Sequence, residues 1–286
     1  MTVHPKEIIS KLLSTLIESA LYAKRVQSKI KPLAEKIGTK NLFAAALSDA
    51  DLSVQTHVEL ALLANFPSIP FYGEEWEISR NTKYFSGKYF VDSEPYLITL
   101  DPIDGTRLYL DGQKEYQIIL TVISRDSFEA VIVLFPCYDE YVYAIRGDGA
   151  FRATFDTTIE KARQWKLTSP PQEIYIGSDL KQFLPKLKES FKVVHCSHEY
   201  SKEVPIPFFN SLLNNQLCGA AISNSQIIDG AALAFVAQEM GYQMQTLDGK
   251  PLPKIIEYPD LILPGMIVAE NTKIIQQIRE CCTTTK

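Results

Sequence analysis

The sequence predicts an α+β fold in two parts, a helix pair with a largely antiparallel sheet followed by a smaller α/β half. Three observations support this. Apolar residues recur at helical spacing near the N-terminus, β-rich runs joined by turn residues follow in the middle, and strands alternate with helices near the end. Alternating strands and helices are typical of a layered α/β arrangement. We expect the two parts to span residues 1–165 and 166–286.

The first part begins with two predicted helices. Residues 6–29 carry Ile8, Leu12 and Leu16 on one helical face, and a second helix over 51–63 ends before Pro67. Short strands are predicted at IPFYGEE and at YLITLD (96–101). Three β-rich runs then follow in the order of an antiparallel meander: 115–125, 127–137 and 140–153.

The second part alternates between the two element types. Strands are predicted at EIYIGS, KVVHCS, CGAAIS and GMIVAE, and helices at 180–191, at 207–214, from about Asp229, and at 271–282. We expect these elements to form one layered α/β unit.

Composition excludes several classes of function. With 46% hydrophobic residues, the 286-residue chain can bury a substantial core, and its net charge of -5 argues against a nucleic acid polymer as partner. No 18-residue stretch is uniformly apolar and no signal peptide is evident, so we expect no membrane span. Five cysteines without zinc spacing indicate reduced thiols in a cytoplasmic protein.

The stretch ITLDPIDGT (98–106) carries the strongest signal for chemistry. A strand delivers Asp101 at its end, Pro102 fixes the turn, and Asp104 stands three residues later. Two carboxylates at this spacing can converge on one hard cation. The N–H groups of Gly105 and Thr106 then open a helix and can bind a phosphate oxygen. The alternative is a simple turn with Asp104 as a helix N-cap.

Further acids stand at the ends of predicted elements. Glu74 and Glu75 end a strand, Asp51 starts a helix, and Asp229 opens the apolar helix that follows Ile228. Each could be a helix cap or a solvated charge, and one of the two adjacent glutamates must point away from any shared site. Together with Asp101 and Asp104, these acids at element ends favour a bound cation.

In these motifs the chain resembles the lithium-sensitive inositol monophosphatase superfamily. The order D…GEE…DPIDGT…D-x(11)-G runs from Asp51 to Gly241, and GDGAF (147–151) resembles the turn after the family's meander. Members include inositol monophosphatases, 3'(2'),5'-bisphosphate nucleotidases and fructose-bisphosphatases. The resemblance implies a magnesium-dependent phosphomonoesterase with an αβαβα sandwich, whose first part binds metal and whose second part binds substrate.

The resemblance also implies roles for single residues. Two or three Mg²⁺ ions would be held by Glu74, Asp101, the Ile103 carbonyl, Asp104 and Asp229. Thr106 and Glu74 would orient and activate a metal-bound water, and Asp51 would assist that water or support a weaker ion. The implied partner is a small-molecule phosphate ester, and a homodimer is consistent with the family.

Residues 104–123 favour one branch of this family. Arg107, Tyr109 and Glu115-Tyr116 match the bisphosphate nucleotidase pattern without a gap, whereas inositol monophosphatases have a neutral residue and a shorter Phe-rich connection. We therefore expect a 3'(2'),5'-bisphosphate nucleotidase, with an inositol monophosphatase or related sugar-phosphate phosphatase as the alternative.

The segment 195–229 departs from the family, because its usual Gly-Ser and Gly-x-Ala-Asp runs are absent or altered. This segment offers His195 and His198 as metal ligands or, as we prefer, polar side chains of a pocket or surface. Its aromatic residues could face a nucleotide base or pack in the core: Tyr200, Phe208 and Phe209.

Two rival functions remain. Haloacid dehalogenase-type enzymes carry D-x-D-G-T, but here two residues separate Asp101 from Asp104. A non-catalytic phosphatase-like binding module is the other, and a magnesium-dependent turnover assay separates it from an enzyme.

Overall fold

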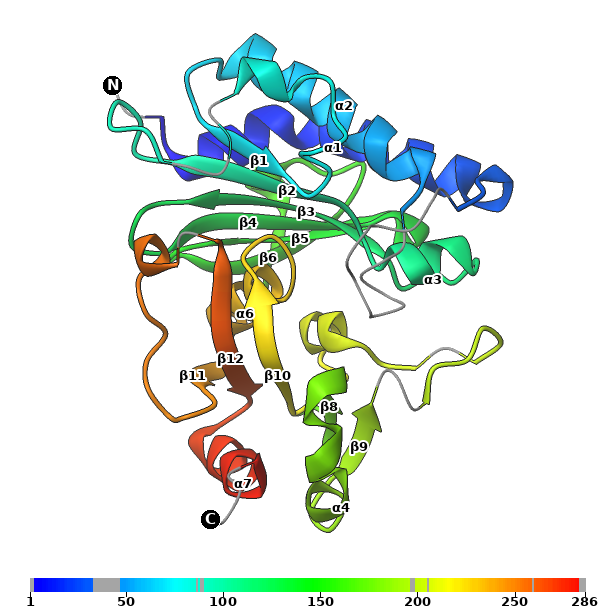
Figure 1. Cartoon of the computed structure of the whole chain (residues 1–286), viewed down its shortest axis with the longest axis vertical. Coiled ribbons are helices and arrows are strands. Elements are labelled where there is room, and N and C mark those ends of the chain that lie inside the picture. Colours follow the sequence, from blue (N-terminus) through cyan, green and yellow to red (C-terminus); the bar gives the residue numbers. More distant parts are fainter. Residues whose placement is uncertain are drawn as a thin grey trace. The chain divides into compact units, whose positions relative to one another are not determined.

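The computed structural model describes residues 3–32, 47–85, 87, 90–195, 199–204, 206–258 and 260–282 (Figure 1). By their contacts, the residues form two compact units. Unit 1 comprises Met1–Arg146 and Phe151–Arg163, and unit 2 comprises Gly147–Ala150 and Gln164–Lys286. Within each unit, helices pack on a sheet, so the prediction of a layered α+β fold is confirmed.

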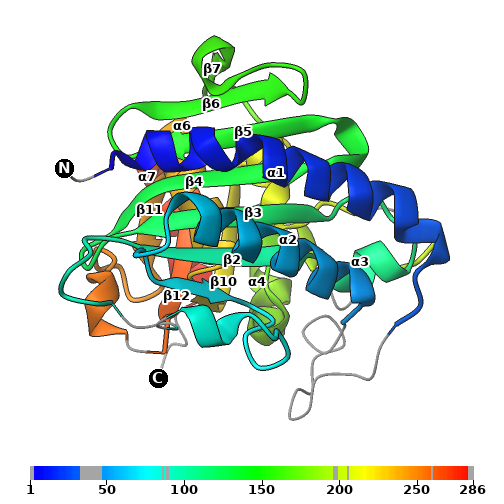
Figure 2. The same ribbon diagram turned by 90° about the horizontal axis from the view of Figure 1, so that it is seen from above.

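Two helices cover one face of the unit 1 sheet (Figure 2). Helix α1 (Pro5–Val26) buries the predicted apolar stripe, which includes Ile8, Leu12 and Leu16. Helix α2 (Asp49–Asn65) begins at Ser48, whose side chain accepts a hydrogen bond from the Ala50 N–H, and ends before Pro67. The predicted helix pair is therefore confirmed, with each helix within three residues of its expected bounds.

The sheet that lies mostly in unit 1 contains seven strands in sequence order. Strand β1 pairs parallel with β2, while β2/β3, β3/β4 and β4/β5 are antiparallel, so the predicted meander is confirmed. The last predicted run divides into β5 and β6, because Gly147 and Gly149 adopt left-handed φ angles of 77° and 93° in the turn. The strands are β1 (Phe71–Gly73), β2 (Leu97–Asp104), β3 (Gln117–Ile123), β4 (Phe128–Phe135), β5 (Glu140–Ile145), β6 (Gly149–Thr154) and β7 (Arg163–Trp165).

The core of unit 1 lies between the helix pair and the sheet. Leu12 of α1, Val58 of α2, and Leu100, Leu120 and Ile132 of the central strands are fully buried in one cluster. Each such side chain contributes about 1.5–3 kcal/mol by leaving water. This packing holds α2 against β2, the strand that carries the predicted metal ligands.

Unit 2 contains a five-stranded sheet in the order β11-β12-β10-β8-β9. Strand β8 pairs parallel with β9 and β10, whereas β12 is antiparallel to β10 and β11. Helices α6 (Gly230–Met240) and α7 (Thr272–Cys282) pack on this sheet. The strands are β8 (Glu173–Ile176), β9 (Lys192–His195), β10 (Gly219–Gln226), β11 (Gln243–Thr246) and β12 (Ile262–Ala269).

Two helix predictions in unit 2 are wrong in type. The segment 180–191 is a 3₁₀ helix (Ser178–Phe183) followed by the single turn α4 (Leu184–Leu187), because Pro185 lacks an N–H and fits only the first turn of a new helix. The segment 207–214 is a 3₁₀ helix, Phe209–Asn214, which stops where Asn215 turns left-handed. Strand β11 was not predicted, because three of its four residues are polar and give no clear alternation with apolar ones.

Four of the five cysteines lie within the described residues. Cys137, Cys218, Cys281 and Cys282 are free thiols, and Cys196 lies outside the described residues. Along the part of the chain that the structure describes, none of the helices has the length and hydropathy needed to cross a membrane.

Candidate active site

The parallel pairing of β1 and β2 brings two of the predicted acids to the same sheet edge. Gly73 pairs with Leu100, and the Glu74 N–H donates to the Leu100 carbonyl at 2.9 Å. Glu74 and Asp101 therefore follow paired residues on adjacent strands. Because parallel strands run in the same direction, both acids leave the sheet at the same end.

The DPIDGT turn is closed by hydrogen bonds of its own residues. The Asp101 carboxylate accepts from the Ile103 N–H at 3.1 Å, and the Thr106 hydroxyl donates to the Ile103 carbonyl at 2.9 Å. Gly105 adopts φ 88°, a left-handed angle that favours glycine, before the five-residue helix α3 (Thr106–Leu110) begins. The turn holds Asp101, Asp104 and Thr106 beside one another.

Asp51 joins this group from helix α2. Its Oδ2 accepts from the Ser48 N–H at 2.9 Å and from the Ser48 hydroxyl at 2.6 Å, while Thr106 Oγ1 lies 3.2 Å from Oδ1. The side chain is fully buried. Burial, and then the charges of Glu74 and Glu75, raise the pKa of Asp51 to about 7, although the Ser48 hydrogen bonds oppose the shift.

Asp104 faces the first residue of β3. Asp104 and Gln117 are register partners, and the Gln117 side-chain amide donates to the Asp104 carboxylate. Burial and the charge of Glu74 raise the pKa of Asp104 to about 6. Glu74 is thus close enough to repel both Asp51 and Asp104, and a bound cation would relieve this repulsion.

The donor set fits magnesium in its chemistry. Glu74, Asp101, Asp104 and the Ile103 carbonyl are hard oxygen ligands, and neighbouring elements supply them. In the described part of the chain, however, no three His, Cys, Asp or Glu side chains converge closely enough to hold a metal ion. The carboxylates of Asp101 and Asp104 instead accept hydrogen bonds from their own turn and from Gln117. Coordination of one ion therefore requires these side chains to rotate.

Asp229 lies in unit 2, whereas Asp51, Glu74, Asp101 and Asp104 lie in unit 1. It caps helix α6, where its Oδ1 accepts from the Gly230 N–H and from the Ser225 hydroxyl at 3.2 Å. Its role as a further metal ligand stays a prediction.

The residues that support these acids were not identified from the sequence. Ser48 and Asp51 form a capping box, for which S-x-x-D is a recognisable signal. Gln55 is buried one helical turn beyond Asp51, and its Oε1 accepts from the Glu75 N–H at 2.9 Å. Gln117 is recognisable only from strand register.

The nucleotidase-like pattern of α3 and β3 lies largely in the core of unit 1. Tyr109 and Tyr116 are fully buried with ring centroids 4.8 Å apart, and the Tyr109 hydroxyl donates to the Ala23 carbonyl. Arg107 pairs with Asp111 at 2.7 Å. The two tyrosines therefore stabilise the fold beneath the DPIDGT turn.

The candidate pocket residues of unit 2 divide between core packing and roles that stay predictions. Phe209 is buried against Tyr175, with ring centroids 6.1 Å apart, so core packing accounts for it. His195 is buried with Nε2 3.3 Å from the Ser178 carbonyl oxygen, and His198 lies outside the described residues. The roles of Tyr200 and Phe208 as base contacts stay predictions.

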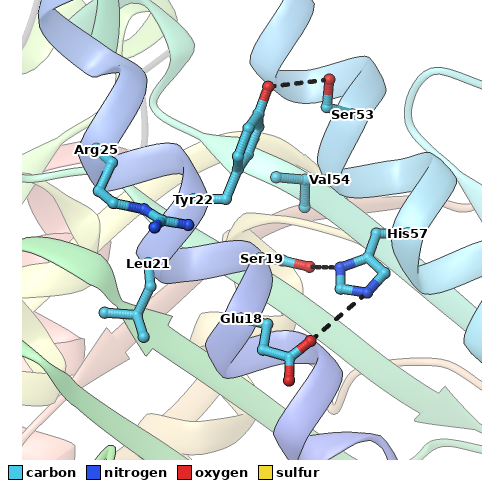
Figure 3. Close-up of a pocket in the computed structure, with 8 residues that line it drawn as sticks. All are labelled: Glu18, Ser19, Leu21, Tyr22, Arg25, Ser53, Val54 and His57. Carbon is cyan, nitrogen blue, oxygen red and sulfur yellow. Dashed lines mark hydrogen bonds and ion pairs between the residues drawn. The ribbon is translucent and has the colours of Figure 1, made fainter.

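A cavity of about 590 Å³ lies elsewhere in unit 1, between α1 and α2 (Figure 3). Within it, His57 Nδ1 lies 3.0 Å from Ser19 Oγ and His57 Nε2 lies 3.8 Å from the Glu18 carboxylate. This resembles a hydrolase triad in residue types only. Ser19 is buried, and its hydroxyl donates to the Thr15 carbonyl, so the oxygen is not presented as a nucleophile.

Comparison with protein families gives one match over nearly the whole chain. Residues 9–283 match the model described as the inositol monophosphatase family.

Curated relatives match over shorter segments. Histidinol-phosphatase from Chlorobaculum parvum is 28% identical over 105 residues, covering 37% of this chain and 36% of the relative. The 3'(2'),5'-bisphosphate nucleotidase CysQ of Haemophilus influenzae is 23% identical over 141 residues, or 48% of each protein. Inositol monophosphatase 2 of Saccharomyces cerevisiae is 24% identical over 164 residues, or 54% of this chain and 51% of the relative. The matched segments thus span between a third and a half of the relatives' lengths.

Solved structures share the fold over almost the full length. A lithium-soaked inhibitory complex of Staphylococcal inositol monophosphatase-1 superposes with a TM-score of 0.72 at 18% identity, covering 99% of this chain and 97% of the other. Extragenic suppressor protein suhB from Bartonella henselae gives 0.72 at 16% identity, covering 98% and 99%. An IMPase/NADP phosphatase complexed with Mg²⁺ and phosphate gives 0.68 at 18% identity and 95% coverage of each.

Proposed function

Since the chain belongs to the inositol monophosphatase family, we propose that it is a magnesium-dependent phosphomonoesterase of small phosphorylated metabolites. The observation that carries this proposal is the group of acids at the shared end of β1 and β2, together with the Thr106–Asp51 contact. The family match supports phosphatase chemistry, and the group of acids supplies hard oxygen donors for it.

In this proposal, Glu74, Asp101, the Ile103 carbonyl and Asp104 hold magnesium, with Asp229 as a further ligand and two or three ions in all. Magnesium supplies neutralisation of phosphate charge, a more acidic water and stabilisation of the leaving oxygen. Burial, and then the charge of Glu74, raise the pKa of both Asp51 and Asp104, which supports a site that is completed by a cation.

Thr106 and Asp51 would manage the proton of the attacking water, with Glu74 as a second orienting carboxylate. Thr106 Oγ1 lies 2.9 Å from the Ile103 carbonyl oxygen and 3.2 Å from Asp51 Oδ1. With the Ile103 carbonyl turned to the cation, the Thr106 hydroxyl would donate its proton to Asp51 Oδ1 and accept a hydrogen bond from the water. In the metal-free protein, burial and the charges of Glu74 and Glu75 raise the pKa of Asp51 to about 7. A cation held beside Glu74 would lower this pKa, so Asp51 would be ionised and able to accept a proton at neutral pH. The Ser48 N–H and hydroxyl hold the other Asp51 oxygen, which keeps the base oriented.

The phosphate itself would be oriented by backbone N–H groups of Gly105 and Thr106. The Gly105 N–H is hydrogen-bonded to the Asp104 carboxylate in the present arrangement. The side-chain rotation that brings Asp104 to a metal would release this N–H for a phosphate oxygen.

We further propose a 3'(2'),5'-bisphosphate nucleotide as the substrate. Support comes from the pattern at residues 104–123 and from the similarity to CysQ of Haemophilus influenzae. A homodimer stays a prediction, which light scattering during size-exclusion chromatography tests.

The decisive experiment is a phosphate-release assay with and without Mg²⁺ on adenosine 3',5'-bisphosphate, inositol 1-phosphate and fructose 1,6-bisphosphate. The proposal predicts turnover that EDTA abolishes and Mg²⁺ restores. Binding of these esters without any turnover would instead favour a non-catalytic binding module.

A further inference from the structure

A buried polar stripe runs along helix α2 directly behind the acids. Asp51, Gln55 and Glu59 stand at four-residue intervals and therefore on one helical face, and all three are fully buried. Buried polar residues at core positions lose hydration and so need specific partners. Asp51 reaches Thr106, as described above, so the partners of Gln55 and Glu59 show what the rest of the stripe does.

Gln55 and Glu59 form a hydrogen-bonded ring with the chain after Glu74. Gln55 Oε1 accepts from the Glu75 N–H, and Gln55 Nε2 donates to Glu59 Oε1, both at 2.9 Å. The Ser79 hydroxyl lies 2.8 Å from both Glu59 oxygens, and the Ser79 N–H donates to the Glu75 carbonyl at 2.9 Å. The Glu75 N–H is thereby linked to the Glu59 carboxylate through the Gln55 amide, and the Glu75 carbonyl is linked to it through Ser79.

This ring fixes the backbone of Glu74. The peptide group before its Cα is held by the Glu74 N–H on the Leu100 carbonyl, and the peptide group after it is held by Gln55 on the Glu75 N–H. With both flanking peptide planes fixed, φ and ψ of Glu74 are fixed, and so is the direction of its Cα–Cβ bond.

The Glu59 carboxylate decides which way the Gln55 amide faces. An ionised carboxylate only accepts hydrogen bonds, so the NH₂ group of Gln55 must face Glu59 and its oxygen must face Glu75. Within the described residues, no cationic side chain forms an ion pair with Glu59. A buried carboxylate with only neutral donors is costly, which suggests that orienting Gln55 is its function.

Gly73 makes room for this arrangement. A Cβ added at Gly73 would lie 2.3 Å from Gln55 Oε1, closer than any real contact, so a side chain there would displace the amide. The glycine of the GEE motif therefore leaves the space that the Gln55 amide occupies.

We propose that Gln55, Glu59 and Ser79 are positioning residues that preorganise Glu74 for metal binding. This inference rests on the proposed function, because it takes Glu74 to be a magnesium ligand. Partners that orient a metal ligand typically contribute about 10- to 100-fold to metal affinity.

The test compares matched variants at pH 8 by three measurements. These are the Mg²⁺ affinity from calorimetry, the hydrogen-exchange rate of the Glu75 amide, and the midpoint of thermal unfolding. Gln55→Leu removes the acceptor for the Glu75 N–H. Gln55→Glu places a second carboxylate against that of Glu59. We expect each to weaken Mg²⁺ binding about tenfold or more and to speed exchange of the Glu75 amide. Glu59→Gln should weaken Mg²⁺ binding less than either change at Gln55, because the introduced amide can still accept from Gln55 but no longer dictates which way the Gln55 amide faces.

A double variant tests whether the hydrogen-bond pattern can be restored with the two side chains exchanged. In the double variant Gln55→Glu/Glu59→Gln, the carboxylate introduced at position 55 can accept from the Glu75 N–H and from the amide introduced at position 59. Affinity and exchange should therefore return to near wild type. Glu18→Gln, an exposed change of the same kind on α1, is the control and should change neither.

A Gln55→Leu variant that keeps wild-type affinity, or a double variant no better than Gln55→Glu, would overturn the positioning role. If Gln55→Leu does not fold, the double variant alone decides between the same two outcomes. Failure of the wild type to bind Mg²⁺ would overturn the proposed function as well, so the two failures are distinguishable.

Discussion

The substitution Asp51→Asn gives a quantitative test of the electrostatics at the acid cluster. Asparagine keeps the size of the side chain and an oxygen that can accept from the Ser48 N–H and hydroxyl, as Asp51 does at 2.9 and 2.6 Å. It removes the titrating charge and places an NH₂ group where Oδ1 faces Thr106 Oγ1. The variant therefore separates the effect of a buried carboxylate from that of a helix cap.

The pKa of Asp51 sets the expected magnitude. It is raised from 3.8 to about 7, chiefly by burial and then by the charges of Glu74 and Glu75. A raised acid pKa means that the folded, metal-free protein binds more protons than the unfolded chain between these pH values. The resulting stability is fully present below about pH 4 and is lost as pH rises to about 7, by up to about 4 kcal/mol.

The assay is urea unfolding in EDTA from pH 4 to pH 8, followed by the fluorescence of Trp76. In a Trp165→Phe background, Trp76 is the single tryptophan and it lies in unit 1. Metal-free wild type should lose stability as pH rises, whereas Asp51→Asn should lose less and be the more stable protein at pH 8. Asp104, with a pKa raised to about 6, would supply the remaining slope. Identical pH profiles for the two proteins would refute this reasoning.

Three further predictions concern catalysis. Asp101→Asn removes the charge of a proposed ligand with little change of volume, so turnover should fall at least about 100-fold with an unchanged circular dichroism spectrum; near-normal turnover at saturating Mg²⁺ would remove Asp101 from the site. Li⁺, as the family resemblance implies, and excess Ca²⁺ should inhibit Mg²⁺-dependent phosphate release, because Ca²⁺ is larger and coordinates more loosely; insensitivity to both would indicate another phosphatase mechanism. Adenosine 3',5'-bisphosphate should be hydrolysed at its 3'-phosphate with a higher kcat/KM than inositol 1-phosphate; the reverse order would move the chain to the monophosphatase branch.

The parts of the fold that follow strong periodicity were predictable from the sequence. The apolar stripe of α1 and the meander of β3–β6 depend on local patterns that tertiary contacts reinforce. The 3₁₀ segment at Ser178–Phe183 was not predictable, because Pro185 interrupts an apolar pattern that otherwise suits a full helix. Strand β11 is defined by its pairing with β12 and has little local signal.

The residues of the candidate site also divide into those that local sequence predicts and those that only tertiary contacts reveal. Glu74, Asp101 and Asp104 were recognisable because their motifs are contiguous in sequence. Gln55 and Gln117 were not, since their roles depend on helix packing and on strand register. A helical projection from Asp51 nevertheless predicts a polar face that includes Gln55 and Glu59, because the three residues are spaced four apart.

The central claim is that the acids at the shared end of β1 and β2 bind the catalytic cation. The most direct test is anomalous diffraction from crystals soaked in Mn²⁺, which prefers the same hard oxygen ligands as Mg²⁺. The account predicts a peak with oxygens of Glu74, Asp101 and Asp104 at about 2.0–2.3 Å. Ordered crystals that show no peak at these carboxylates under millimolar Mn²⁺ would contradict it.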